Sequence, residues 1–128
     1  MGDKLRHRVL VVEDDAAVLE AIQLMLRNDY EVIVATNGKD AVKLYQAYKP
    51  DIVLMDINLP EMDGVMATRE IIKIDPNAKI IGISAYAKRR GEELLKAGAK
   101  EVIEKPFSKS KLLETVRRYL DGSGASEG

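Results

Sequence analysis

The sequence predicts a single α/β domain in which an open parallel sheet is covered by helices on both sides. Three observations point to this fold. The chain has 128 residues, the size of one ordinary domain. Five short apolar runs recur along it, and a segment of helical periodicity follows each run. Such an alternation of strand and helix is typical of βαβ units, which build parallel sheets.

The five apolar runs are the predicted strands. Four of them are continuous rather than alternating and rich in β-branched residues, as in strands buried on both faces of a parallel sheet. The fifth is short and lies between Glu101 and Glu104, which favours an edge strand. In chain order the runs occupy residues 9–12, 32–35, 52–55, 80–83 and 102–103.

The predicted helices follow from apolar stripes at helical spacing, which mark the face that each helix turns to the core. The fourth stripe is short, so the fourth helix is expected to be short as well. In chain order the stripes are Val18, Leu19, Ile22, Met25 and Leu26; Ala41, Leu44, Tyr45 and Tyr48; Val65, Thr68, Arg69 and Ile72; Leu94 and Leu95; and Leu112, Leu113, Val116 and Leu120.

Capping residues set the ends of these helices. Polar side chains before a stripe predict its beginning, and glycine or proline after a stripe predicts its end. The first three helices are expected to begin at Asp15, Asn37-Gly38 and Gly64. The third ends at Asp75-Pro76, the fourth at Gly98, and Ser108 or Ser110 caps the fifth.

One domain is expected to fill residues 6–121. The remaining residues 122–128 have the Gly-Ser composition of a flexible linker or a cloning remnant. The apolar runs are far shorter than the roughly 20 residues that span a bilayer. No signal peptide is visible, so we expect a cytoplasmic protein without a membrane segment.

Composition excludes several classes of function. The formal net charge is −1, which argues against direct binding of nucleic acid or another polyanion. There are no cysteines, so disulfides, thiolate catalysis and cysteine-based metal sites are absent. His7 is the only histidine, which excludes multi-histidine metal sites and argues against a Ser–His–Asp triad.

Polar side chains follow four of the predicted strands. Glu13 and Asp14 follow the first, Asp56 the third, Ser84 the fourth and Lys105 the fifth. In open α/β sheets, ligands bind outside the carboxyl ends of the strands. If the first and third strands are neighbours, the three acids lie close together, and their repulsion favours a bound cation. Ligands that are all oxygen favour Mg²⁺, or else Mn²⁺.

Such a site suits phosphoryl chemistry. A partly hydrated cation leaves coordination positions for a phosphoryl group. Lys105 and Ser84 can then donate to phosphoryl oxygens. The carboxylate of Asp56 is a competent nucleophile for an acyl phosphate.

Four motifs give the chain a close resemblance to the receiver domains of two-component response regulators. The resemblance covers residues 8–121, and the motifs fall in the family's order and spacing. They are Val11-Val12-Glu13-Asp14-Asp15; Asp51-Ile52-Val53-Leu54-Met55-Asp56-Ile57-Asn58-Leu59-Pro60-Glu61-Met62-Asp63-Gly64; Ser84-Ala85; and Lys105-Pro106-Phe107.

The resemblance implies a CheY-like, flavodoxin-like fold with strand order 2-1-3-4-5 and five helices. It also implies a role for each matched residue. Asp56 is the phosphoacceptor, Ser84 and Lys105 bind the phosphoryl group, and the Lys105–Pro106 peptide is cis. Mg²⁺ is held by Asp14, Asp56 and the backbone carbonyl of Asn58, with Glu13 acting through water.

Two positions set this chain apart from the best-known family pattern. Many members carry an aromatic switch residue three positions before the lysine, where this chain has Val102. Tyr86 lies two residues after Ser84, where its ring could shield the phosphoryl group. We hypothesise that Tyr86 and Asn58 set how fast water reaches the phosphoaspartate. Asp15 is expected to cap a helix rather than bind metal, and Asp63-Gly64 to form a turn and helix start without chemistry.

The resemblance further implies a signalling switch rather than an enzyme that turns over a free substrate. The phosphodonor is a sensor histidine kinase or a histidine phosphotransfer protein. Residues 88–118 hold ten basic and five acidic residues. The fourth helix, fifth strand and fifth helix form this face. In the family, this face meets an output partner or a second receiver. Contact with a second receiver would make a phosphorylation-dependent homodimer. An ordinary solvated face explains the charges equally well.

Three other functions are weighed against this one. A haloacid-dehalogenase-type phosphatase also uses aspartate and Mg²⁺, but needs a second acid where this chain has Asn58. A flavodoxin-like carrier of FMN needs a phosphate loop after the first strand, where this chain has Glu13 and Asp14. A receiver-like domain that is never phosphorylated is disfavoured because every site residue type is present.

Overall fold

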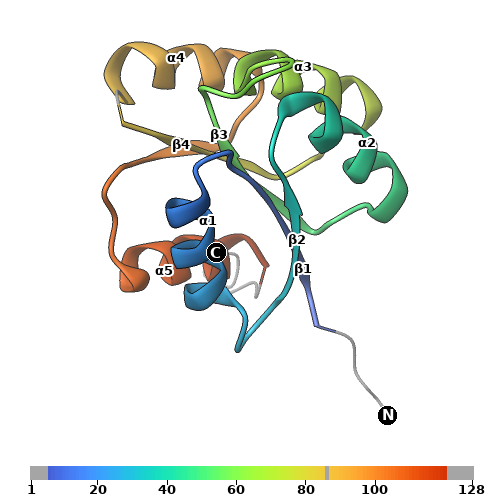
Figure 1. The fold of residues 1–128 in the computed structure, drawn as a ribbon. Coiled ribbons are helices and arrows are strands. Elements are labelled where there is room, and N and C mark those ends of the chain that lie inside the picture. Colours follow the sequence, from blue (N-terminus) through green and yellow to red (C-terminus); the bar gives the residue numbers. More distant parts are fainter. Residues whose placement is uncertain (1–5, 86, 121–128) are drawn as a thin grey trace.

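The computed structural model describes residues 6–85 and 87–120, in which parallel strands alternate with helices (Figure 1). The sheet has the strand order β2-β1-β3-β4-β5, which confirms the predicted fold class and topology. The strands are β1 (Arg8–Val12), β2 (Glu31–Ala35), β3 (Ile52–Asp56), β4 (Ile80–Ser84) and β5 (Glu101–Glu104). The helices are α1 (Ala16–Leu26), α2 (Gly38–Tyr48), α3 (Gly64–Ile74), α4 (Ala87–Ala97) and α5 (Lys109–Leu120).

Helices cover both faces of the sheet. Helices α2, α3 and α4 lie side by side on one face, and α1 and α5 lie on the other (Figure 1). Successive side chains of a strand point to opposite faces of the sheet, so each apolar run contributes residues to two cores. Leu10 and Val12 lie in the core under α2 to α4, whereas Val9 and Val11 lie in the core under α1 and α5. This double burial explains why the central runs are continuously apolar.

The predicted helix caps are confirmed. The Asp15 carboxylate accepts from the amides of Ala17 and Val18 at 2.9 and 3.1 Å. Asn37 caps α2 in the same way, and Ser108 rather than Ser110 caps α5. These side chains satisfy amide groups that have no partner inside a helix.

The prediction that strand β2 is buried on both faces was wrong. Of its residues, only Ala35 is buried. The strand order places β2 at the edge of the sheet, where the flanking helices cover it incompletely. A continuous apolar run therefore did not distinguish an edge strand from a central one. The prediction for the other edge strand, β5, is confirmed.

The helical stripes were also wrong in part. Arg69 is exposed, and Ile71 takes the buried position in α3. Tyr48 and Leu95 are 49% and 46% exposed, although both belonged to predicted stripes. Helix α4 has 11 residues and is not short.

The register of the sheet brings the ends of its strands to one level. Val12 pairs with Met55, and Asp56 with Ile83. The residue after β1 and the last residue of β3 therefore lie beside each other. Among the described residues, no helix is long and apolar enough to cross a membrane. Residues 121–128, which include the predicted tail, lie outside the described residues, and the domain limits remain a prediction.

Candidate functional site

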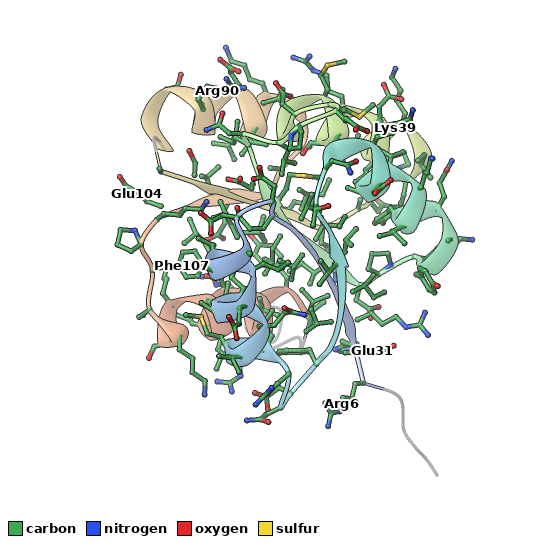
Figure 2. All side chains as sticks on the ribbon, in the orientation of Figure 1. Arg6, Glu31, Lys39, Arg90, Glu104 and Phe107 are labelled. Carbon is green, nitrogen blue, oxygen red and sulfur yellow. The ribbon has the colours of Figure 1, made fainter. Side chains whose placement is uncertain are left out.

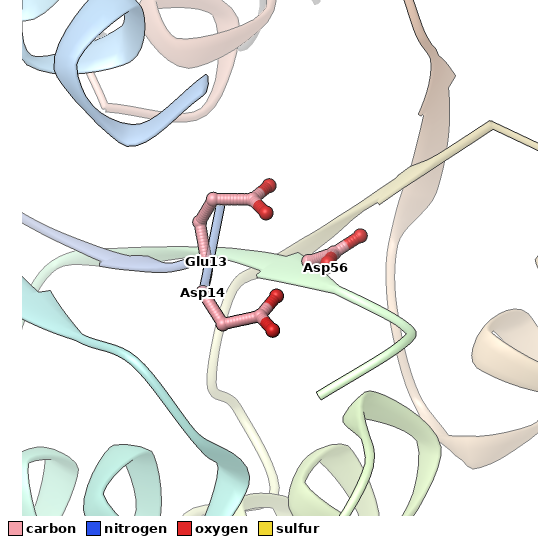
Figure 3. A group of neighbouring side chains, drawn as sticks. All are labelled: Glu13, Asp14 and Asp56. Carbon is pink, nitrogen blue, oxygen red and sulfur yellow. The ribbon is translucent and has the colours of Figure 1, made fainter. Parts of the chain in front are cut away.

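Three carboxylates meet at the carboxyl edge of the sheet. Glu13, Asp14 and Asp56 each offer an oxygen within 4.8 Å of the others. Figure 3 shows Glu13 and Asp14 on the segment after β1, both facing Asp56 at the end of β3. Glu13 and Asp56 are 2% and 6% exposed, whereas Asp14 is open to solvent. The sequence prediction that these acids cluster is confirmed.

Lys105 places its ammonium between the two buried acids. Its Nζ lies 3.1 Å from Glu13 Oε1 and 3.3 Å from Asp56 Oδ1. The lysine begins the loop after β5, and its amide donates to the carbonyl of Ser84 at 2.9 Å. The peptide between Lys105 and Pro106 is cis, as expected.

The charges of this cluster are unevenly compensated. Burial and the neighbouring charge of Glu13 raise the pKa of Asp56 to about 6, against the opposing pull of Lys105. Burial disfavours the charged form of Lys105, but Glu13 and Asp56 together raise its pKa above the ordinary value. One cation among three acids leaves the site in excess of negative charge.

The residues present fit a hard cation. All the side-chain donors are carboxylate oxygens, which Mg²⁺ prefers. Oε2 of Glu13 accepts from the amide of Asp15 at 3.1 Å. Its buried Oε1 has the Lys105 ammonium nearby but no aligned hydrogen bond among the described residues. A cation or its bound water would satisfy this oxygen, and Asp14 opens the cluster to solvent.

Ser84, Asn58 and Val102 are further predicted site residues that the structure describes. Ser84 is the buried last residue of β4, one position beyond the partner of Asp56 in the register. Asn58 is exposed on the loop after β3. Val102 is partly buried in β5 under α4, where a Cβ added to Gly91 would meet it at 3.5 Å. Tyr86 lies outside the described residues.

Gly64 has a role that was not predicted from the sequence. Its amide donates to the Ile57 carbonyl at 2.8 Å, and a Cβ at this position would lie 2.0 Å from the carbonyl oxygen of Asp56. Only glycine allows α3 to begin this close to the acidic cluster. The Asp-Gly pair was visible in the sequence, but nothing there indicated the approach to Asp56.

An apolar groove beside the cluster was also missed. It has a volume of about 300 Å³ and lies between α1 and the segment that starts at Lys105. No local pattern could reveal it, because its two walls lie some 80 residues apart in the chain. Its lining residues are Ala17, Val18, Ala21, Ile22, Met25, Lys105, Pro106 and Phe107.

Comparison with known proteins agrees with the resemblance seen in the motifs. The family model for the response regulator receiver domain matches residues 9–117. The chain belongs to this family. The receiver domain is 49% identical over 115 residues to the chemotaxis protein CheY of Thermotoga maritima, a match that covers 87% of this chain and 95% of that protein. It is 40% identical to CheY of Bacillus subtilis, with coverage of 91% and 100%.

Solved structures show the same fold. The receiver domain of a Pseudomonas aeruginosa sensor histidine kinase, with a magnesium ion coordinated in its active-site cleft, is 32% identical, with a TM-score of 0.86. That match covers 91% of this chain and 98% of the other. CheY of Borrelia burgdorferi, solved in complex with CheX, BeF₃ and Mg²⁺, is also 32% identical, with a TM-score of 0.83 and 88% of each chain covered. This chain is therefore a CheY-like receiver domain of two-component signalling.

Proposed function

We propose that this receiver domain is a phosphorylation switch whose phosphoacceptor is Asp56. The observation that carries the proposal is the position of Asp56. It is buried at the end of a central strand, with Glu13 and Asp14 on one side and the Lys105 ammonium 3.3 Å away. An aspartate without a function would have no reason to lie beside two further acids and a lysine.

The transfer step follows from nucleophilic catalysis. An oxygen of the Asp56 carboxylate attacks the phosphorus of a phosphohistidine on a sensor histidine kinase or a histidine phosphotransfer protein. A P–O bond forms as the P–N bond breaks, and the imidazole leaves with the bonding electron pair and takes up a proton. The ordinary ionised form of Asp56 is the attacking one, so the raised pKa of about 6 still leaves it reactive at neutral pH.

The acidic cluster would hold Mg²⁺, with Mn²⁺ as a substitute. Asp14, Asp56 and the backbone carbonyl of Asn58 would be ligands, and Glu13 would act through water. When bound, the cation supplies positive charge opposite the phosphoryl oxygens. Lys105 is close enough to Asp56 to neutralise a second phosphoryl oxygen after transfer.

Phosphorylation would then change contacts at the ends of β4 and β5. A phosphoryl dianion on Asp56 draws in Lys105 and the hydroxyl of Ser84, each of which can donate to it. Both residues connect to the surface formed by α4, β5 and α5, since the Lys105 amide bonds the Ser84 carbonyl. A shift in this surface would control an output partner or form a homodimer with a second copy. Val102 leaves no aromatic side chain to turn inward here.

The apolar groove supports docking of the phosphodonor. Lys105 belongs both to the groove and to the acidic cluster, so a protein seated on α1 lies next to Asp56. The groove is lined mainly by aliphatic carbon, which suits an apolar patch around the donor histidine.

Tyr86 and Asn58 would set the lifetime of the phosphoaspartate. Asn58 is exposed two residues after Asp56, in a position to meet water that approaches the site. A Tyr86→Ala variant is expected to change the rate of dephosphorylation, measured by loss of the phosphoryl adduct after a desalting step. An unchanged rate contradicts this role.

The alternative functions fit the site less well. The Asn58 amide cannot serve as the second acid of a haloacid-dehalogenase-type phosphatase. Glu13 and Asp14 occupy the place where an FMN carrier needs a neutral phosphate loop, and they would repel the phosphate. We therefore propose a switch that acts on its own aspartate, and not an enzyme with a free substrate.

Intact-mass spectrometry tests the proposed function. Incubation with acetyl phosphate and Mg²⁺ is expected to add one phosphoryl group to the wild type and none to Asp56→Asn. Asp51→Asn, an exposed acid at the opposite end of β3, is the matched control and should keep the adduct. A wild type without an adduct, or an adduct that survives in Asp56→Asn, contradicts the proposal.

A further inference from the structure

We propose that Arg90 is a positioning residue, which acts through Asp63 to hold the loop between β3 and α3 in the form that binds the cation. The inference rests on the cation site of the proposed function. It concerns a loop, residues 57–63, that begins directly after Asp56 and carries Asn58.

This loop has an unfavourable backbone. Glu61 and Met62 have φ angles of 49° and 90°, and neither is glycine. Residues with a Cβ adopt such angles only where surrounding contacts impose them. The loop therefore depends on its anchors for its shape.

Three of the anchors use the backbone. The amide of Gly64 bonds the Ile57 carbonyl at 2.8 Å, and the amide of Lys39 bonds the Glu61 carbonyl at 3.1 Å. Gly38 leaves room for the carbonyl of Met62, since a Cβ there would lie 1.9 Å from its oxygen. These contacts tie the loop to α2 and to the start of α3.

The fourth anchor is a side-chain contact from α4. Nη2 of Arg90 lies 3.5 Å from Asp63 Oδ2, while Asp63 Oδ1 caps α3 by accepting from the Met66 amide at 3.0 Å. Nε of Arg90 is buried and lies 3.2 Å from Oε1 of Glu93 on the same helix, an ion pair without an aligned hydrogen bond among the described residues. Figure 2 shows Arg90 on α4 and Lys39 on α2, and α3 lies between these helices (Figures 1 and 2).

The consequence is a connection between α4 and the cation ligands. Asp63 precedes Gly64, whose Cα lies against the carbonyl of Asp56. A displacement of Asp63 would therefore move the start of α3 and, with it, the peptide that follows the phosphoacceptor. The backbone anchors are fixed by the fold, but a partly exposed ion pair yields when α4 shifts.

The test measures Mg²⁺ affinity by titration of the full chain, with heteronuclear NMR as the readout. The variants are Arg90→Ala, Asp63→Asn and the double variant. Asparagine keeps the helix cap of Asp63 but removes its charge, so α3 should still begin at the same residue. Lys73→Ala is the matched control, because it breaks an α3 ion pair of 3.2 Å with Glu70 that does not touch the loop.

Both single variants are expected to weaken Mg²⁺ binding by roughly 5- to 10-fold, within the range of ordinary coupling between sites. The double variant should bind Mg²⁺ no more weakly than the weaker-binding single variant, because the two substitutions remove the same contact. Lys73→Ala should bind like the wild type. The thermal midpoints of Asp63→Asn and Lys73→Ala should match, which shows that Asp63→Asn affects position and not folding.

The sign of the Arg90→Ala effect separates positioning from simple charge. Loss of a positive charge near the cluster would tighten Mg²⁺ binding if only long-range electrostatics acted. Tighter or unchanged binding in Arg90→Ala, or additive effects in the double variant, overturns the inference. Such a result with an intact phosphoryl adduct on wild-type Asp56 leaves the proposed function standing, so the two failures are distinguishable.

Discussion

The Nζ of Lys105 lies 3.3 Å from Oδ1 of Asp56, within a cluster where two further acids surround that carboxylate. One ammonium therefore balances the charge of Asp56 only in part. Burial and the charge of Glu13 keep the pKa of Asp56 raised, at about 6. The structure thus retains an acid at a site where its ionised form is unfavourable, which is typical of a functional group rather than a stabilising one.

This imbalance predicts that Asp56→Asn stabilises the cation-free domain. A carboxyl whose folded pKa lies above its unfolded value costs stability as pH rises from about 4 through about 6, and the cost is complete above that. After allowance for solvent screening, we expect Asp56→Asn to raise the free energy of unfolding by about 1 kcal/mol at pH 8. The gain should be mostly lost near pH 3.5, where Asp56 is protonated in the folded state and largely protonated in the unfolded state. Urea denaturation with EDTA at both pH values measures it, and equal gains at both contradict the explanation.

The same pKa predicts how Mg²⁺ affinity depends on pH. A proton on Asp56 competes with the cation, so binding should weaken as pH falls below about 6 and be nearly constant above pH 7. Each pH unit below the pKa costs at most about tenfold in affinity through this group. Isothermal titration calorimetry from pH 5 to pH 8 tests this, with Asp51→Asn as a control that should follow the wild type. A pH-independent affinity over this range would count against Asp56 as a ligand.

Gly64→Ala is expected to be severely destabilising, because a Cβ would lie 2.0 Å from the Asp56 carbonyl oxygen. Overpacking against backbone cannot be relieved by a rotamer change, so we expect a loss of at least about 3 kcal/mol. Gly91→Ala is the matched control in α4, since its Cβ would meet Val102 at an ordinary 3.5 Å. Alanine there should stabilise by roughly 0.5 to 1 kcal/mol through helix propensity. Thermal unfolding followed by circular dichroism compares the two, and equal effects would sink the argument.

Tyr45→Phe is expected to alter the alkaline stability of the domain. The hydroxyl of Tyr45 donates to Asp75 Oδ2 at 2.7 Å, and burial together with this carboxylate raises the pKa of Tyr45. The unfolded chain releases the tyrosine proton near pH 10, so the contribution of Tyr45 is complete below that pH and is lost above it. Tyr45→Phe should cost about 1 kcal/mol at pH 7 and less at pH 10.5. Tyr48 is 49% exposed, and Tyr48→Phe is the control. The cost of this substitution should not fall between pH 7 and pH 10.5 in the same urea titrations.

Ala21→Glu is expected to impair transfer from a phosphohistidine donor without impairing the reaction with acetyl phosphate. Ala21 is exposed and lines the apolar groove beside Lys105, so a carboxylate there would lose its hydration only when a partner docks, at a desolvation cost. We expect transfer to slow by roughly tenfold or more, since 1.4 kcal/mol suffices for that factor. Leu24→Glu, on an exposed position of the same helix, is the control. Equal slowing with acetyl phosphate would place the effect in the site and not in docking.

Much of this protein could be predicted from local sequence. The apolar runs and helix caps depend on neighbouring residues, so β1, β3 and β4 and the caps at Asp15 and Asn37 were predicted correctly. The acids and the lysine after the strands were identified because parallel strands end at a common edge. The wrong predictions concerned which residues and strands the rest of the fold buries. Nothing local shows that β2 lies at an edge, since its run reads like those of the central strands.

Tertiary structure alone decided the relationships between residues far apart in the chain. The contact between Gly64 and the Asp56 peptide, the left-handed backbone at Met62 and the pair of Arg90 with Asp63 all arise from the packing of α2, α3 and α4 around one loop. The residue types of the proposed cation site are thus local and can be identified in the motifs. Their precise spacing is collective, because it depends on helices whose approach to the sheet no single segment specifies.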